Sequence, residues 1–312
     1  MIKKGTGALL DTIDVKTHPA HFSSASAARS RAADFFALTK PRLNFLVVIT
    51  AGVGYYLGAG RDLHLMKIVE AVAGTALVAG GAAGLNQVYE RETDSLMWRT
   101  RKRPVAAGRL TVNESTIFSL ALAGAGLAML AAGANLLAAV LALLTLVSYN
   151  AVYTPMKRRS QLATLVGAVP GALPPLIGWA AAQGRLTPEA WALFAIVFVW
   201  QIPHFMAIAW LYRDDFRRAG FPLLPVVNAD GKSTARQAVI FSVLLLPISL
   251  VPFVLHAAGA IYAAGAIAGG LGILGLSMSF ASQRTDERAR RLFIASITYL
   301  PMLWMLLIAD RL

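Results

Sequence analysis

Residues 71–87, AVAGTALVAGGAAGLNQ, contain no charged side chain and consist mostly of glycine and alanine. Small residues of this kind let helix backbones approach one another closely inside a membrane. The stretch ends in Asn86 and Gln87, directly before a strongly charged segment. It therefore predicts a tightly packed membrane helix that presents polar side chains at one end.

Outward from this stretch, the same apolar character continues through most of the chain. The protein has 312 residues, of which 57% are hydrophobic and 14% are charged, whereas a soluble domain usually carries about 25% charged residues. Nine apolar segments follow Pro41, each close to the roughly 20 residues that span a bilayer. We predict an all-α membrane protein with helices over residues 43–60, 68–90, 115–133, 136–154, 162–182, 190–211, 238–256, 259–280 and 292–309.

The positive charges predict how these helices are oriented. With the N-terminus on the inner side, 25 of the 29 Lys and Arg residues fall in internal segments. Such a bias indicates a cytoplasmic N-terminus and, with nine spans, a C-terminus on the opposite side. Residues 1–41 are polar and lack the apolar segment of a secretory signal, so we expect a disordered cytoplasmic tail. Residues 42–312 then form one polytopic domain.

Composition also excludes several classes of function. The net charge of +13 could suggest nucleic-acid binding. That interpretation fails here because the positive charges lie in short loops between apolar spans, where they set the orientation of a membrane protein. The absence of cysteine excludes disulfides, cysteine-ligated zinc and a cysteine nucleophile. No Asp, Glu, Lys or Arg falls near the centre of a predicted span, which disfavours an ion-coupled transporter.

The charged segment after the opening stretch begins with a regular column of oxygen-bearing side chains. Asn86, Glu90 and Asp94 recur every four residues, which places them along one face of a helix. Two carboxylates and an amide oxygen suit a hard cation such as Mg²⁺ that is shared with substrate phosphates. The plainer interpretation is a helix end whose acids pair with neighbouring arginines.

Three predicted internal loops combine such acids with cations. The segment WRTRKRP, residues 98–104, offers guanidinium groups that suit phosphate, and the segments YTPMKRRS and WLYRDDFRR carry further charges. Together they favour a Mg²⁺-diphosphate site over charges that merely set orientation. The residues singled out in these loops are Arg99, Arg103, Tyr153, Lys157, Arg158, Asp214 and Asp215. Inside the spans, His204 is the one ionisable candidate, and both substrate contact and helix packing remain open for it.

Four stretches closely resemble the haem O synthase family, within the UbiA superfamily of intramembrane prenyltransferases. They are LTKPRLNFLVVIT, NQVYERETDSLMWRTRKRPVAAG, YTPMKRRSQLATLVGAVPGALPPLIGW and WQIPHFMAIAWLYRDDFRRAGFPLLPV, in the family's order. The resemblance implies a nine-helix UbiA-type bundle around a central cavity. It also implies transfer of a farnesyl group from farnesyl diphosphate to a vinyl group of haem B, with addition of water, giving haem O and diphosphate.

The resemblance assigns expected roles to individual residues. Asn86, Glu90 and Asp94 match the family's first motif, N-x-x-x-D-x-x-x-D, with Glu at the middle position, and Asp215 best matches the retained acid of a reduced second motif. These four are the expected Mg²⁺ ligands and catalytic residues. Residues expected to bind diphosphate or the haem propionates are Arg99, Arg103, Tyr153, Lys157, Arg158, His204 and Asp214.

We expect a bacterial inner membrane, with the mitochondrial inner membrane as the less favoured alternative, and the resemblance leaves three rivals open. Expected partners are the lipid bilayer and a haem A synthase or terminal-oxidase assembly protein, with no nucleic acid. The nearest rival is a UbiA relative that uses 4-hydroxybenzoate, a quinone precursor or a chlorophyllide as acceptor. A small-molecule or haem transporter is more remote because no charge falls near the middle of the spans, and a non-catalytic oxidase scaffold is more remote because it has no use for the acidic column.

Overall fold

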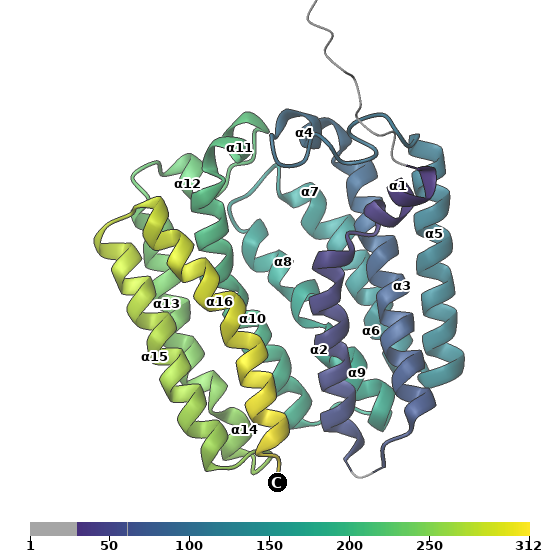
Figure 1. Ribbon diagram of the computed structural model, residues 1–312, viewed down its shortest axis with the longest axis vertical. Coiled ribbons are helices and arrows are strands. Elements are labelled where there is room, and N and C mark those ends of the chain that lie inside the picture. The colour runs from purple at the N-terminus through teal and green to yellow at the C-terminus, as the bar shows by residue number, and fades with distance from the viewer. Residues whose placement is uncertain (1–29, 61) are drawn as a thin grey trace, which may run out of the picture.

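The computed structural model describes residues 30–60 and 62–312. Within these ranges, nine helices are long and apolar enough to cross a membrane, which confirms the expected all-α multi-pass architecture (Figure 1). The spans run Pro41–Ala59, Leu65–Tyr89, Val112–Ala134, Leu136–Met156, Ala163–Gln183, Pro188–Leu211, Lys232–Val254, Ala260–Ser282 and Asp286–Ala309.

Five spans are single helices, and four are built from consecutive pieces. The single helices are α2 (Pro41–Ala59), α3 (Leu65–Tyr89), α10 (Pro188–Leu211), α15 (Ala260–Ser282) and α16 (Asp286–Ala309). The composite spans are α5 (Val112–Met129) with the π-helix η1 (Leu130–Ala134), α6 (Leu136–Val147) with the π-helix η2 (Ser148–Tyr153) and α7 (Thr154–Met156), α8 (Ala163–Ala172) with α9 (Pro174–Gln183), and α13 (Lys232–Ser249) with α14 (Val251–Val254). Short helices outside the spans are α1 (Arg31–Leu38), α4 (Arg91–Leu96), α11 (Arg213–Arg218) and α12 (Leu224–Val227).

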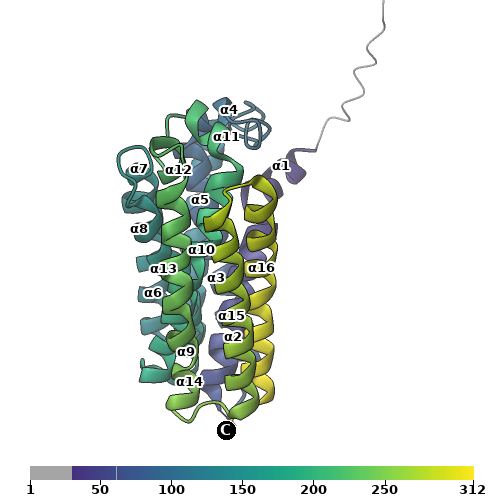
Figure 2. The same cartoon turned by 90° about the vertical axis from the view of Figure 1, so that its left-hand side faces the viewer.

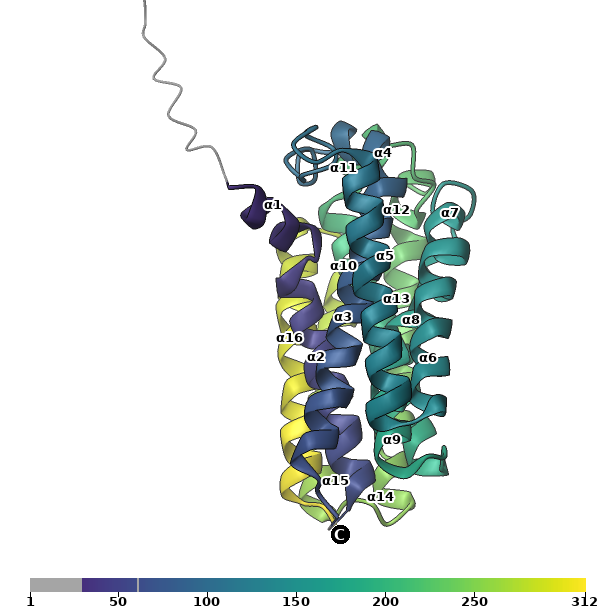
Figure 3. The ribbon, with the colours of Figure 1, turned by 90° about the vertical axis from the view of Figure 1, so that its right-hand side faces the viewer.

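The spans run side by side along the length of the molecule, and the short helices outside the spans gather at one end (Figures 2 and 3). We call this the loop end; it carries α1, α4, α7, α11 and α12 (Figure 1). The opposite end, where α2, α9, α14 and α16 terminate, is the far end, and the C-terminus lies there (Figure 1). The three charged loops singled out in the sequence therefore share one end of the bundle.

Two spans begin about six residues earlier than hydropathy indicates. The seventh starts at Lys232 rather than at residue 238, and the ninth starts at Asp286 rather than at residue 292. The ninth is begun by Thr285, whose hydroxyl accepts a hydrogen bond from the backbone N–H of Arg288 at 3.3 Å. Both helices therefore begin before their apolar segments. Their first turns carry charged side chains, which remain accessible to water outside the membrane.

The prediction of a disordered N-terminal tail does not hold for residues 31–38. Residues 1–29 of that tail lie outside the described ranges. Residues 31–38 form α1, which packs against the bundle instead of being disordered. Leu38 is fully buried, and the carboxylate of Asp34 accepts hydrogen bonds from the side chain of Arg109 at 3.0 Å. Gln87 donates a hydrogen bond to the carbonyl of Leu38 at 2.7 Å. This anchoring couples the start of the first span to the loop end.

Glycines set the closest helix contacts. A methyl group on Gly126 of α5 would lie 2.6 Å from the carbonyl oxygen of Gly74 of α3, and one on Gly178 of α9 would overlap the carbonyl of Ala51 of α2. Backbones this close cannot accommodate any side chain at these positions. The glycine- and alanine-rich residues 71–87 thus form the predicted close contact, between α3 and α5.

Candidate active site

A cavity of about 240 Å³ opens at the loop end, between the ends of α2, α3, η2 and α10 and the loops that follow them. One part of its wall is charged and the other is apolar. The lining residues are Lys40, Leu43, Asn86, Glu90, Asp94, Met97, Arg99, Arg103, Tyr149, Tyr153, Lys157, Ala163, Thr164, Phe205, Ile208, Ala209, Phe216, Phe221 and Leu223. Seven of the residues singled out in the sequence are therefore brought to one cavity.

The column of Asn86, Glu90 and Asp94 keeps helical spacing although α3 ends at Tyr89. The backbone N–H of Glu90 donates to the carbonyl of Asn86 at 2.9 Å, and that of Asp94 donates to the carbonyl of Glu90 at 2.7 Å. These bonds follow the helical i to i−4 pattern across the junction with α4. The three side chains consequently face the same cavity, as the spacing predicts.

Each member of this column is held by a cation. Lys157 approaches the Glu90 carboxylate at 2.8 Å, and Arg103 donates to the two Asp94 oxygens at 2.8 and 2.7 Å. Burial raises the pKa of Glu90, but the charges of Lys157 and Lys40 outweigh burial, so the pKa lies below its ordinary value. Both acids are nearly inaccessible to solvent. The acidic column is therefore embedded in positive charge, and Glu90 stays ionised at neutral pH.

Lys40 is the main cation that the sequence reasoning missed. Its ammonium donates to Oδ1 of Asn86 at 2.6 Å, from the residue directly before Pro41. Burial, followed by the charge of Arg103, lowers the pKa of Lys40 to about 7. Its φ of 50° lies in the left-handed region, a conformation rare for a non-glycine residue. Proline favours extended backbone at the residue before it, so the dipeptide Lys-Pro gave no signal of this conformation.

Two tyrosines are aimed at the cavity by the π-helix η2. Tyr149 and Tyr153 both line it, with ring centroids 5.5 Å apart, and the ammonium of Lys157 lies 4.6 Å from the centroid of the Tyr153 ring. A π-turn changes which side chains face a neighbour, and such turns recur at functional sites. Tyr149 was not predicted, since its direction depends on this irregularity.

Asp215 connects the two longest loops rather than lining the cavity. Its oxygens accept hydrogen bonds from the backbone N–H groups of Trp98 and Arg99, each at 3.3 Å, and its carboxylate also pairs with Arg218. The side chain is buried. Asp215 thereby fixes the chain segment that carries the cavity's arginines, and its expected role as a metal ligand stays a prediction.

Three other predicted residues lie away from the cavity lining. Asp214 is exposed and pairs with Arg217 on the same helix at 2.5 Å, and Arg158 lines a different surface depression. His204 faces α16, where its Nδ1 lies 2.8 Å from the hydroxyl of Ser296. The His204 ring stacks between Trp200 and Phe293, with centroids 5.2 Å away in both cases. The assigned roles of all three stay predictions.

The oxygen donors at the cavity suit a hard divalent cation. Within residues 30–60 and 62–312, no group of three or more His, Cys, Asp or Glu side chains is assembled as a metal site. Glu90, Asp94 and the amide of Asn86 nevertheless line one cavity, and carboxylate and amide oxygens are the ligands that Mg²⁺ prefers. The donor set thus fits Mg²⁺, with room for substrate oxygens to complete the coordination.

The sequence matches one protein family over most of its length. Residues 47–306 match the model of the UbiA prenyltransferase family. A protein of Solibacter usitatus (strain Ellin6076) named "Protoheme IX farnesyltransferase" is 46% identical over 287 residues, which is 89% of this chain and 98% of that protein. The family match therefore reaches into all nine spans and includes the loops between them.

Solved structures share the architecture at low sequence identity. A structure described as a digeranylgeranylglyceryl phosphate synthase superposes with a TM-score of 0.76 at 16% identity, covering 89% of this chain and 98% of that one. A UbiA homolog from Archaeoglobus fulgidus bound to GPP and Mg²⁺ gives a TM-score of 0.62, also at 16% identity, covering 88% and 99% of the two chains. These likenesses establish the fold.

Proposed function

The chain belongs to the UbiA prenyltransferase family, and on that premise we propose that it transfers a farnesyl group from farnesyl diphosphate to a vinyl group of protohaem IX. The observation that carries the proposal is the loop-end cavity, where acids, cations and an apolar wall meet. The name of the Solibacter relative, which is similar over nearly its whole length, supports protohaem IX as the acceptor.

The cations of the cavity supply the binding site for a diphosphate. Lys40, Arg99, Arg103 and Lys157 approach from three separate segments and surround the acidic column. Fixed positive charge placed where negative charge develops lowers the barrier to departure of the leaving group. Arg99 is held in place by the bond from its backbone to Asp215 and lies 5.3 Å from the ring centroid of Tyr212.

A divalent cation fits the same cavity. Asn86, Glu90 and Asp94 would hold Mg²⁺, which would neutralise diphosphate oxygens when bound. In the described structure Lys157 and Arg103 pair with these carboxylates. We propose that both cations turn toward the diphosphate when the metal takes their place beside the acids.

The reaction that this site supports begins with cleavage of the allylic C–O bond, whose electron pair leaves with the diphosphate. The vinyl group of the porphyrin then attacks the farnesyl cation, and water captures the new cation beside the ring, releasing a proton. Phe205, Ile208 and Phe221 form an apolar wall that limits premature attack by water. The electron-rich rings of Tyr149 and Tyr153 line the same space and can stabilise positive charge.

We place this reaction in a bacterial cytoplasmic membrane, with the loop end on the cytoplasmic side. The positive charge concentrated at the loop end and the bacterial source of the Solibacter relative support this placement. The product would then pass within the membrane to a haem A synthase or to a terminal oxidase under assembly.

The decisive experiment incubates the purified protein with haem B, farnesyl diphosphate and Mg²⁺. Mass spectrometry should detect a porphyrin heavier by one farnesyl group plus water, together with released diphosphate. A parallel incubation with 4-hydroxybenzoate tests the nearest alternative acceptor. Prenylation of 4-hydroxybenzoate without any change in haem B would contradict the proposed acceptor and leave the family assignment intact.

His204 gives a prediction about stability rather than turnover. Because its ring packs between Trp200 and Phe293 and faces α16, His204→Ala should destabilise the fold by about 2 kcal/mol. Packing alone predicts an unchanged KM for haem B, whereas the substrate-binding role expected from the resemblance predicts a raised KM. Thermal unfolding in detergent and steady-state kinetics measure the two quantities, and a raised KM with unaltered stability would instead place His204 in substrate binding.

A further inference from the structure

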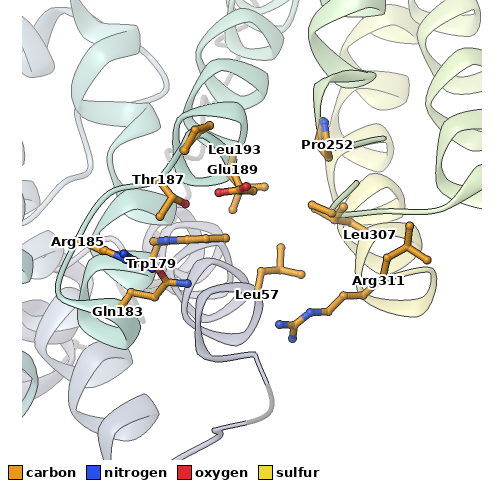
Figure 4. A pocket seen from close by; sticks show the side chains of 13 residues that line it. Leu57, Trp179, Gln183, Arg185, Thr187, Glu189, Leu193, Pro252, Leu307 and Arg311 are labelled. Atoms are coloured by element: carbon orange, nitrogen blue, oxygen red, sulfur yellow. The ribbon is translucent and has the colours of Figure 1, made fainter. Parts of the chain in front are cut away.

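A second pocket, of about 480 Å³, lies at the far end of the bundle (Figure 4). Its walls come from α2, α9, α10, α14 and α16, together with the loops between them. On α10, Leu193 of this pocket is twelve residues before Phe205 of the loop-end cavity, a rise of about 18 Å. Ile196 and Val197 are buried between them, so the two pockets are separate.

Buried hydrogen-bond donors in this pocket have no partner. Trp179 lines it and is only 6% exposed, yet its indole Nε1 forms no hydrogen bond with any described residue. The hydroxyl of Thr187 is in the same situation (Figure 4). Leaving a buried donor unsatisfied costs about 1–3 kcal/mol. Two such donors in one pocket indicate a ligand with acceptor oxygens.

Three charged side chains complete the lining. Arg185 and Arg311 reach the pocket from opposite sides, with Glu189 between them (Figure 4). Among the described residues, no carboxylate lies within 4.0 Å of either guanidinium, and no cation lies within 4.0 Å of Glu189.

The side chains of Arg185 and Arg311 differ in how firmly they are held. Arg311 donates to the backbone carbonyls of Tyr56 at 3.1 Å and Gly60 at 3.2 Å, and its own backbone pairs with Ala258. Among the described residues, the side chain of Arg185 makes a single hydrogen bond, to the side-chain oxygen of Gln183 at 3.4 Å. One cation is therefore fixed, and the other is able to move toward a ligand.

We propose that this pocket binds the headgroup of a phospholipid of the phosphoethanolamine class, which carries a phosphate and a primary amine. Guanidinium groups match phosphate oxygens, and the indole and hydroxyl donors supply further hydrogen bonds. Glu189 pairs with the ammonium, whereas an anion without an amine would meet an unpaired carboxylate. Leu57, Leu193 and Leu307 contact the adjoining apolar part of the lipid.

The place of the pocket along the bundle agrees with this ligand. Spans end around it, so it lies at the level where lipid headgroups meet water. Trp191, in the first turns of α10, is half exposed at the same level, as is usual for tryptophan at a membrane interface. A headgroup can therefore enter from the surrounding lipid.

Native mass spectrometry of the purified protein, with equal amounts of phosphatidylethanolamine, phosphatidylglycerol and phosphatidylcholine, tests the proposal. The wild-type protein should retain phosphatidylethanolamine preferentially. Arg185→Gln should lower the retained fraction about tenfold, the effect of losing one charge-assisted hydrogen bond. Glu189→Gln should shift the preference to phosphatidylglycerol. Lys67→Gln, which removes an exposed cation at the same end outside the pocket, should change nothing.

Several results would overturn the proposal. Equal retention by Arg185→Gln and wild type, or an effect of Lys67→Gln as large as that of Arg185→Gln, would show that the pocket does not hold the lipid. Displacement of the lipid by inorganic phosphate would identify a free-anion site, and retention of haem B in its place would identify a porphyrin site. The measurement requires no turnover, so its failure is distinguishable from failure of the proposed transferase activity.

Discussion

Asp94→Asn is expected to lower kcat/KM for farnesyl transfer by about 10³-fold, the scale of losing one electrostatic group at a reacting centre. Asp94 is almost wholly buried, lines the loop-end cavity and is the acid held by Arg103. Asparagine keeps the shape of the side chain but removes the charge that would bind Mg²⁺. Steady-state kinetics at increasing Mg²⁺ concentration should show a weaker dependence on the metal as well as a lower maximum rate.

A matched control and a double variant separate metal binding from structural pairing. Glu92→Gln removes an exposed acid of α4, at the same end of the bundle but outside the cavity lining, and should leave activity unchanged. The double variant Asp94→Asn, Arg103→Gln removes both members of the buried pair, so no unpaired charge remains. Recovery of activity in the double variant would show that Asp94 serves only to neutralise the charge of Arg103, and it would also contradict the proposed role of Arg103 in binding diphosphate.

Gly178→Val is expected to destabilise the bundle by about 3 kcal/mol or more, at the upper end of the effects of overpacking. A Cβ at this position would overlap the carbonyl oxygen of Ala51 and lie 2.7 Å from the backbone nitrogen of Tyr55. Both atoms belong to the backbone of α2, which cannot move without separating α2 from α9. The unfolding midpoint of the purified protein, or its yield from the membrane, measures the loss.

Gly275→Ala provides the comparison for this effect. Nothing lies within 4 Å of a Cβ built at Gly275 of α15, so an added methyl group meets open space. Alanine also favours a helix over glycine by about 1 kcal/mol, and the variant should be as stable as wild type or more stable. Equal destabilisation by both substitutions would mean that the α2–α9 contact is not the cause.

Much of the loop-end site was predictable because its pattern is local. Asn86, Glu90 and Asp94 share a face through helical spacing alone, and Lys157 follows Tyr153 by one helical turn. Such relations need no knowledge of neighbouring helices. The expected roles of these residues in metal and diphosphate binding rest on the family resemblance and await the experiments above.

The residues that were misplaced or missed depend on other parts of the chain. Asp214 and Asp215 are adjacent in sequence, but only Asp215 turns inward to the backbone of Trp98 and Arg99. Lys40 reaches Asn86 only because α1 and α2 are anchored at the loop end. No spacing rule links positions so far apart in the sequence.

The amino-acid sequence by itself determined the nine spans, the single end at which the charged loops gather, and the acidic column, because hydropathy and helical periodicity act between near neighbours. Tertiary structure alone decided which cations meet those acids, that α1 folds onto the bundle, and that Arg185, Glu189 and Arg311 share a pocket at the far end. These contacts join distant segments, and their geometry is set by how closely glycine-containing helices pack against one another.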